Sequence, residues 1–489
     1  MTMHALSSMD AAWFLGETPS MSFHVANLHL FDKPPRGADP MRKLREQVGE
    51  RAPYLPLLHR RLDQRSLKMG NPVWIDEPDL DLDYHLQRIK LPAPGRPQQL
   101  IDAVVQLHTP LLDRAHPLWQ IWLIEGLAGG GFALYMKLHH GGVDGGSASM
   151  VVDGLFGDTA RPQGTATGAP VQPTPPPTPA SLLLRTAEDL YLRMPLRVMQ
   201  TARELWQLQG EAAPSGKRFG LDDLRQLMRP APRTPFNRGL SPARSFGWAS
   251  LPLSAVKALG KAHQATINDI VLAVITGALR QHLAGRQQLP RQPLVAGVPV
   301  SVRTPGDTAH NNQVSLMLAR LPVDEADPAR WIPVIRRSVD AAKNLQDAAR
   351  PVSRLLVEMP SLRAPAVNNL MSMMEGMKAA EDLRLHHHLP PFVNLYVSNV
   401  PGPRQPLRFD GMAARTFIPV PLLMHGTALN ITCVSYLDRI DFGVLASPEA
   451  LPDAQALADG LVEAYGQLQQ RLAATAPAAA AGNDLRSPA

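Results

Sequence analysis

Short apolar runs of strand length occur in both halves of the chain, between segments whose apolar residues have helical spacing. The strand-like runs are residues 24–31, 72–77, 132–140, 293–302, 392–400 and 428–437. Residues 97–112 and 267–283 instead repeat apolar side chains at the three- to four-residue spacing of one helix face. Because each half mixes both patterns, we predict an α/β fold in each half.

The chain is too long for a single hydrophobic core, which rarely extends beyond about 250–300 residues. It has 489 residues, of which 45% are apolar and 19% are charged, so there is material for two cores. Residues 161–180 contain seven prolines and almost no large aliphatic side chain, which is typical of an exposed linker. We predict a first domain at residues 1–160, a proline-rich linker with crossover helices at 161–235, a second domain at 236–472 and a low-complexity tail at 473–489.

Within the predicted linker, residues 181–208 form an amphipathic pattern interrupted by Pro195. This pattern is compatible with helices packed across the two domains and also with a helix resting on lipid. Acidic residues at 188, 189 and 204 dilute the basic face that lipid binding prefers. Packing between the domains is therefore favoured, and the lipid contact stays open.

Charge and cysteine content restrict the class of protein. The formal net charge is +6, a small excess that suits anionic substrates or an acidic membrane surface and indicates no nucleic-acid partner. The single cysteine, Cys433, excludes an intrachain disulfide and a cysteine-based zinc site, and suits a reducing compartment.

No targeting or membrane-spanning segment is predicted. Residues 1–17 lack a basic segment followed by a long apolar run, so no secretory signal is indicated. The longest uncharged stretch, residues 416–437, is interrupted by Pro419 and Pro421 and falls short of the ~20 apolar residues of a spanning helix. We predict a cytoplasmic protein that contacts the inner face of the membrane, or a lipid-droplet surface, only peripherally.

The strongest candidate catalytic residues lie at the end of the run 132–140. The sequence there reads His139-His140-Gly-Gly-Val-Asp144-Gly145. The strand period of two places His139 and His140 on opposite faces, so the pair is not expected to bind one metal ion. His140 is followed by glycines that let a substrate approach closely, and an imidazole titrating near neutral pH suits a general base. Asp144 would orient the turn or pair with a cation. A core histidine in a glycine turn is the alternative.

Other site types are not supported. The chain has no Gly-x-Ser-x-Gly, no phosphate-binding loop and no Gly-x-Gly-x-x-Gly after a strand, which counts against a serine hydrolase, a nucleotide hydrolase and a dinucleotide enzyme. Residues 386–388 are three consecutive histidines, but such side chains diverge on a loop, so we predict a solvated loop. We expect neither a metal nor a cofactor.

The motif from His139 to Gly145 resembles the HHxxxDG motif of CoA-dependent acyltransferases, including chloramphenicol acetyltransferase and peptide-synthetase condensation domains. Other blocks resemble the bacterial wax ester synthase/diacylglycerol acyltransferase family and follow its order over nearly the whole chain outside the linker and tail. They are LSSMDAAWFLGE (6–17), Pro117-Leu118-Trp119, IEGL (124–127), NDIVLA (268–273) and SNVPGP (398–403).

The resemblance implies two CoA-dependent acyltransferase-type domains joined by a long crossover, with the active-site tunnel between them. Acyl-CoA would be a substrate, and diacylglycerol or a long-chain alcohol the acceptor. His140 would take the acceptor's proton while its oxygen attacks the thioester, with no acyl-enzyme intermediate. His139 would be supporting and Asp144 structural, with Arg303 as its candidate partner.

A tetrahedral intermediate needs a hydrogen-bond donor at its oxyanion. Asn268 and Asn399 are the candidates in the second half. Each has a structural alternative of at least equal weight, because Asn268-Asp269 would cap the following helix and Asn399 precedes a Pro-Gly turn. Trp119 would pack beneath the catalytic strand or line the acyl tunnel, and packing is favoured.

Two other functions remain as alternatives to ester formation. An amide-forming condensation enzyme shares the HHxxxDG motif, although such domains normally belong to multimodular chains. A non-catalytic lipid-binding or interaction protein would share the fold, although the intact His140, Asp144 and Gly145 argue against it. Neither the choice between diacylglycerol and fatty alcohol nor the acyl chain length follows from the sequence.

Overall fold

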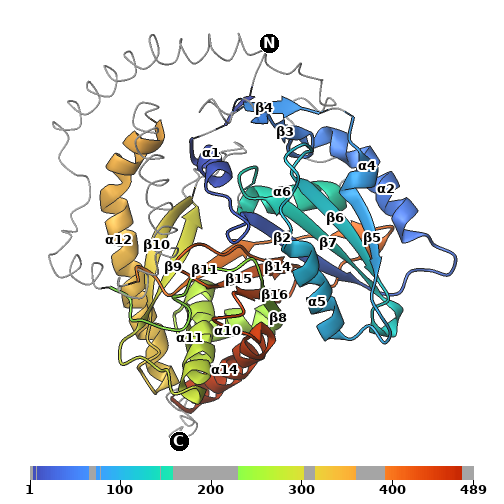
Figure 1. Ribbon diagram of the computed structural model, residues 1–489. Helices are drawn as coiled ribbons and strands as arrows, with labels where there is room; N and C mark the ends of the chain where they lie inside the picture. Colours follow the sequence, from blue (N-terminus) through green and yellow to red (C-terminus); the bar gives the residue numbers. More distant parts are fainter. Residues whose placement is uncertain are drawn as a thin grey trace, which may run out of the picture.

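The computed structural model contains two mixed α/β units, each built on its own sheet (Figure 1). It describes residues 4–6, 8–64, 66, 73–77, 79–143, 145–157, 230–301, 314–358 and 391–475. Most of the predicted linker, including residues 181–208, lies outside these ranges, as do residues 386–388 and the end of the tail. The predicted α/β fold is confirmed, and the bounds of the four predicted segments stay predictions.

The first unit contains a five-stranded sheet in the order β14-β2-β7-β6-β5. Strand β2 runs antiparallel to β7, β7 antiparallel to β6, and β6 parallel to β5. The strands are β2 (His24–Phe31), β5 (Leu86–Lys90), β6 (Trp119–Glu125), β7 (Phe132–His139) and β14 (Ile418–Val420). A small sheet of β1 (His4–Ala5), β4 (Val73–Asp76) and β3 (Arg60–Leu62) lies beside it.

Helices cover both faces of this sheet because its strands are apolar on both sides. Side chains from α2 and α6 share one hydrophobic cluster with alternate residues of β6 and β7, while α5 packs on the opposite face. The helices described in the first half are α1 (Ser8–Leu15), α2 (Pro40–Arg51), α4 (Leu82–His85), α5 (Pro97–His108) and α6 (Gly145–Phe156), with 3₁₀ turns at Ala52–Tyr54, Pro56–Leu58 and Ala128–Gly130.

The second unit contains a six-stranded sheet in the order β10-β9-β11-β15-β16-β8. Strand β11 is parallel to both of its neighbours, and the other pairs are antiparallel. The strands are β8 (Ser245–Pro252), β9 (Leu294–Ser301), β10 (Val314–Leu321), β11 (Leu395–Pro401), β15 (Leu429–Tyr436) and β16 (Arg439–Ala446). A separate ribbon pairs β12 (Arg408–Phe409) with β13 (Met412–Ala413).

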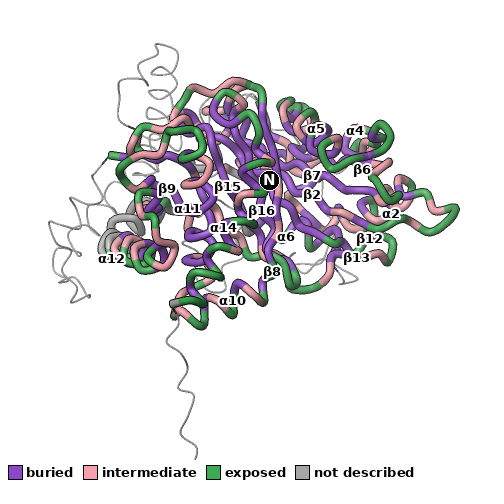
Figure 2. The backbone as a smooth tube through the Cα atoms, turned by 90° about the horizontal axis from the view of Figure 1, so that it is seen from below, coloured by how far each residue is buried: buried purple, intermediate pink, exposed green. Residues whose placement is uncertain are grey.

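The largest hydrophobic cluster joins this sheet to the helices packed on it, with α11 buried along most of its length. Figure 2 shows the strands of both units buried, while the outer faces of α10 and α12 are exposed. Among the residues that the structure describes here, the helices are α10 (Leu253–Ala262), α11 (Ile267–Gly285), α12 (Trp331–Glu358) and α14 (Ala454–Thr475), with a 3₁₀ turn at Pro328–Arg330.

Strand β14 belongs to the second half of the chain but completes the sheet of the first unit. The Phe417 amide just before it donates to the buried carboxylate of Asp441 on β16 over 2.7 Å. A Cβ atom at Gly443 of β16 would lie 1.7 Å from the Pro419 carbonyl oxygen. The two units are therefore joined by close backbone packing as well as by their connection along the chain.

Candidate active site

The histidine pair lies where β7 meets the turn that leads into α6. The strand ends at His139, one position earlier than predicted, and His140 is the first residue of the turn. The Gly142 amide donates to the His139 carbonyl over 3.0 Å, and the His140 amide donates to the Phe23 carbonyl over 2.7 Å. The backbone thus holds both imidazoles in place, while their side chains have separate surroundings.

The ring of His139 faces into the first unit and is fully engaged. Its Nδ1 accepts a hydrogen bond from the Gly141 amide over 3.0 Å. In the neutral ring Nε2 therefore carries the proton and donates to Oε1 of Glu17 over 3.1 Å. Burial lowers the pKa of His139, outweighing the contacts with Glu17 that raise it, so the ring is neutral at pH 7.

Gly141 is required by the packing of this ring. Phe14 of α1 stacks on the imidazole of His139 with centroids 4.3 Å apart and planes 9° from parallel. A Cβ atom at Gly141 would lie 2.5 Å from Cε2 of Phe14 and 3.0 Å from Nδ1 of His139. The first glycine of the motif therefore lets the turn pass close to the stacked pair.

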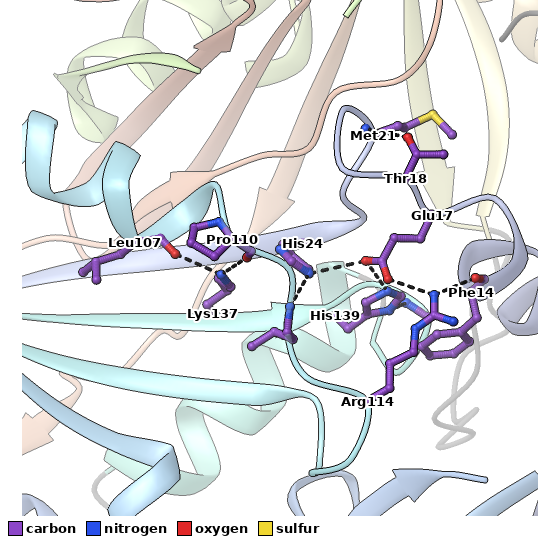
Figure 3. A network of polar contacts seen from close by, with 12 residues as sticks. Phe14, Glu17, Thr18, Met21, His24, Leu107, Pro110, Arg114, Lys137 and His139 are labelled. Atoms are coloured by element: carbon purple, nitrogen blue, oxygen red, sulfur yellow. Dashed lines mark hydrogen bonds and ion pairs between the residues drawn. The ribbon is translucent and has the colours of Figure 1, made fainter. Parts of the chain in front are cut away.

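Glu17 is the centre of a buried polar network (Figure 3). Its carboxylate, with a side chain 3% exposed, is 2.8 Å from Nη2 of Arg114 and 3.4 Å from Nε2 of His24. Arg114 also donates to the carbonyl of Phe14 over 2.7 Å. Burial alone would raise the pKa of Glu17, but the contacts with His139 and His24 outweigh it and hold the pKa well below its usual range. Glu17 is therefore ionised at neutral pH, in contact with His139 and His24.

A second set of buried polar groups continues along the same face of β7. Nζ of Lys137 donates to the backbone carbonyls of Leu107 (2.9 Å) and Pro110 (2.6 Å), as Figure 3 shows. Burial lowers the pKa of this amine to about 7. Nearby, Nδ1 of His108 lies 2.8 Å from the hydroxyl of Tyr135. These contacts tie the end of α5 and the segment after it to the catalytic strand.

His140 has an apolar neighbourhood that joins both halves of the chain. Its ring lies 4.5 Å from that of Trp13, between centroids. Trp13 packs against a cluster of Met21, Phe23 and Leu422, with Met424 at its edge. His140 is partly buried. An imidazole beside apolar side chains from both halves suits a reaction between two lipid substrates.

Trp119 packs beneath the catalytic strand. It is 1% exposed, its Nε1 donates to the Leu58 carbonyl over 2.8 Å, and its ring stacks on His85 at 4.0 Å. The carbonyl of Leu118 accepts from the His139 amide over 3.1 Å. The Pro117-Leu118-Trp119 block therefore supports His139 directly, in agreement with the packing interpretation.

The structure brings only some of the predicted site residues to one place. Asp144 and Arg303 lie outside the described residues, so their pairing stays a prediction. Gly145 is the first residue of α6. Residues 386–388 also lie outside, and the described residues contain no group of three or more His, Cys, Asp or Glu that could hold a metal ion.

Asn268 and Asp269 lie in the first turn of α11, but neither begins it. Thr266 is the N-cap and accepts from the Asp269 amide, while the Asp269 carboxylate accepts from the Thr266 amide. Asp269 therefore completes a capping box. Asn399 lies in β11 opposite Cys433 of β15. No hydrogen bond joins either asparagine to His140 in the part of the chain that the structure describes, so their donor role stays a prediction.

The sequence pattern does not mark Glu17, Arg114 or His24 as site residues. Glu17 ends the block 6–17 that resembles the family, and His24 begins a predicted strand, but neither position indicates a partner. A carboxylate placed directly after an apolar helix is the only signal, and it equally fits a solvated helix end. The network forms only through the packing of α1 and the segment after it against the end of β7.

Comparison with known proteins identifies the family. The catalytic-domain model of wax ester synthase/diacylglycerol acyltransferase matches residues 6–271, and the C-terminal domain model of that family matches residues 310–469. The chain belongs to the wax ester synthase/diacylglycerol acyltransferase family. It is therefore an acyl-CoA-dependent acyltransferase, as the resemblance of its motifs implied.

Individual relatives are similar over nearly the whole chain. A putative diacylglycerol O-acyltransferase of Mycobacterium tuberculosis is 34% identical over 477 residues, covering 95% of this chain and 99% of the relative. The wax ester synthase/diacylglycerol acyltransferase of Marinobacter aquaeolei VT8 has a TM-score of 0.66 and 27% identity, over 96% of this chain and 100% of that one. The first condensation domain of the calcium-dependent antibiotic synthetase shares the fold alone, with a TM-score of 0.52, 17% identity and 98% coverage of both chains.

Proposed function

We propose that His140 is the general base of this acyltransferase and that its acceptors are diacylglycerol and long-chain alcohols. The observation that carries the proposal is the different surroundings of the two adjacent histidines. His139 has both ring nitrogens hydrogen-bonded inside the first unit. His140 instead lies at the turn, beside an apolar cluster drawn from both halves of the chain.

The proposed reaction is a direct transfer. His140 takes the proton of the acceptor hydroxyl as the hydroxyl oxygen forms a bond with the thioester carbonyl carbon. The carbonyl electron pair moves to its oxygen and returns as the carbon–sulfur bond breaks. CoA leaves as a thiolate, which takes the proton from the imidazolium of His140. A general base of this kind contributes roughly 10²- to 10⁴-fold to the rate. Acyl-CoA is a substrate here, and no cofactor enters the mechanism.

The remaining motif residues have supporting roles in this proposal. Glu17, through His139, holds the turn that carries His140, and the absence of a side chain at Gly141 lets that turn close. Asp144 is assigned a structural role with Arg303 as its partner, and Gly145 starts the helix that follows. Asn268 and Asn399 remain candidates for contacts with the substrate.

Ester formation is favoured over the two alternatives. The condensation domain is similar in fold only, whereas the family models match both halves of this chain. A non-catalytic lipid-binding protein would not need His140 beside the apolar cluster. The motif and the site around it are therefore better explained by catalysis.

We assign the protein to the cytoplasm, at the inner face of the membrane or a lipid-droplet surface. Among the described residues, no helix combines the length and apolar composition needed to cross a membrane. Leu15 and Leu111 are 47% and 41% exposed, and Arg114 connects their two segments through the Phe14 carbonyl. Flotation with vesicles of anionic lipid tests this assignment. Recovery of all the protein in the unbound fraction would contradict it.

The acceptor assignment is tested by incubating the purified protein with palmitoyl-CoA and either hexadecanol or diacylglycerol, and measuring free CoA. A competition with equal amounts of both acceptors then ranks them. We expect thiol release with at least one acceptor, and release with neither contradicts the proposal. His140→Ala is expected to abolish release without changing the thermal midpoint. Turnover equal to the parent would show that His140 is not the base.

A further inference from the structure

Trp13 carries a buried hydrogen-bond donor that the fold does not use. Its Nε1 atom is buried and has no hydrogen-bond partner among the described residues. Other tryptophans bond this group, as Trp119 does to the Leu58 carbonyl and Trp331 to the Glu325 carbonyl. Leaving a buried N–H without an acceptor is costly and calls for an explanation.

The unused donor lies beside the proposed base. Trp13 and His140 have ring centroids 4.5 Å apart with planes inclined at 43°. Trp13 also meets Phe23 edge to face, with ring centroids 4.7 Å apart. The next residue along α1, Phe14, stacks on His139. One turn of α1 therefore places two aromatic rings on the two adjacent histidines, and only one of these rings has a donor.

The surroundings of Trp13 are apolar. Met21, Phe23 and Leu422 form the cluster against which it packs, and Val25, Leu240 and Met424 are also at its edge. In such surroundings a hydrogen bond to a charged oxygen is worth much more than in water. A donor already fixed in place also needs no reorganisation when charge develops on the substrate.

We propose that the indole N–H of Trp13 donates a hydrogen bond to the thioester carbonyl oxygen of acyl-CoA. This proposal rests on His140 being the base, because the acceptor oxygen held by His140 must be next to the carbonyl carbon. When that oxygen bonds to the carbon, the carbonyl electron pair moves onto the carbonyl oxygen, and the Trp13 hydrogen bond strengthens. The bond weakens again when the carbon–sulfur bond breaks.

Trp13 is a better candidate for the oxyanion donor than the two asparagines proposed from the sequence. Asn268 is in a capped first turn of α11 and Asn399 is within β11, and neither has a hydrogen bond to His140 among the described residues. Trp13 is in ring contact with His140 and its donor is unsatisfied. It is therefore the better-placed donor in the described part of the chain.

The test is Trp13→Phe, which keeps an aromatic ring but removes the indole N–H together with part of the bicyclic ring system. We expect kcat with palmitoyl-CoA and hexadecanol to fall about 10²- to 10³-fold, the effect of removing one oxyanion donor. The KM for palmitoyl-CoA should change less than about 3-fold, because the bond forms mainly in the transition state. The thermal midpoint should fall less than in Trp331→Phe, because both variants lose the same ring atoms but only Trp13→Phe also removes an unsatisfied buried donor.

Trp331→Phe is the matched control. Its indole N–H already has the Glu325 carbonyl as partner over 3.0 Å, at the start of α12. That variant should lose more thermal stability than Trp13→Phe and keep kcat. Turnover by Trp13→Phe equal to the parent would overturn the proposal.

The pH dependence of kcat separates a substrate donor from a residue that acts through the base. We expect the profile of Trp13→Phe to be lowered at every pH without moving along the pH axis. A shifted profile would mean that Trp13 tunes His140, and would overturn the proposal. Failure of the base assignment is recognised separately, by full turnover in His140→Ala.

Discussion

Glu17 and His139 are joined by a hydrogen bond of 3.1 Å across 122 positions of sequence. The carboxylate comes from the segment after α1 and the imidazole from the last residue of β7. Because Nδ1 of the same ring is held by the Gly141 amide, the orientation of the ring and of the turn are set together. The buried carboxylate of Glu17 therefore helps to fix the position of the turn that contains the next residue, His140.

Glu17→Gln is expected to weaken both catalysis and stability. The variant keeps a side chain of similar size but leaves Arg114, 27% exposed, without its carboxylate. We expect the free energy of unfolding in urea to fall by roughly 1–3 kcal/mol, and kcat to fall about 10- to 100-fold through misplacement of the turn. Glu46→Gln is the control, because Glu46 pairs with Arg42 at the surface. A variant with parent kcat would exclude a positioning role for Glu17.

Gly141→Ala should disturb the stacked pair of Phe14 and His139. The added Cβ would lie 2.5 Å from Phe14, so the ring or the turn must move. We expect a loss of roughly 1–3 kcal/mol in the free energy of unfolding and a lower kcat. Adding Phe14→Leu should restore part of the stability by making room. As a control, Gly466→Ala on α14, where no atom lies within 4 Å, should stabilise by about 0.4–1 kcal/mol. Equal behaviour of the two alanine variants would contradict the packing argument.

Lys137 gives stability a distinct pH dependence. Burial lowers its pKa from 10.5 to about 7 in the folded chain. Between these values the unfolded chain binds more protons than the folded chain, so stability rises with pH over this window. The free energy of unfolding in urea should rise by roughly 1–3 kcal/mol more in the parent than in Lys137→Met between pH 7 and pH 9.5. Lys257→Met, at an exposed position of α10, is the control. A difference that is constant with pH would show that the amine titrates normally.

Asp441 is expected to be essential for the connection between the units. Its buried carboxylate accepts from the Phe417 amide and the Ser250 hydroxyl. Asp441→Ala leaves these donors unpaired and should lower the free energy of unfolding by roughly 1–3 kcal/mol. Asp459→Ala is the control, at an exposed position of α14 where the carboxylate accepts only from Gln455 among the described residues. Its free energy of unfolding should stay within about 0.5 kcal/mol of the parent value. The comparison is made by urea denaturation, and equal losses would contradict the buried role.

The strands and helices near the site were largely predictable because their signals are local. The run 24–31 coincides with β2, and residues 132–140 extend one position beyond β7. The helix predicted over 97–112 ends at His108. Two residues further on, Pro110 has no backbone N–H to donate to the helix, so the helix does not continue through it. The pattern at 267–283 matches α11, although Thr266 rather than Asn268 caps it.

β14 was not predictable in this way. Its three residues, Ile418–Val420, are too few to show a period, and their partner strand is nearly 400 positions earlier. What makes them a strand is the free edge of β2, together with the close approach of Pro419 to Gly443. A pairing between distant segments depends on the folded arrangement of both.

The amino-acid sequence by itself determined the alternation of strands and helices, the histidine motif and its resemblance to a family, because each is encoded in neighbouring positions. Only the tertiary structure decided which histidine is enclosed with Glu17 and which one meets Trp13. Those contacts arise when α1 packs against the end of β7, more than a hundred residues away. Burial, and with it the lowered pKa of Lys137, also exists only after that packing is complete.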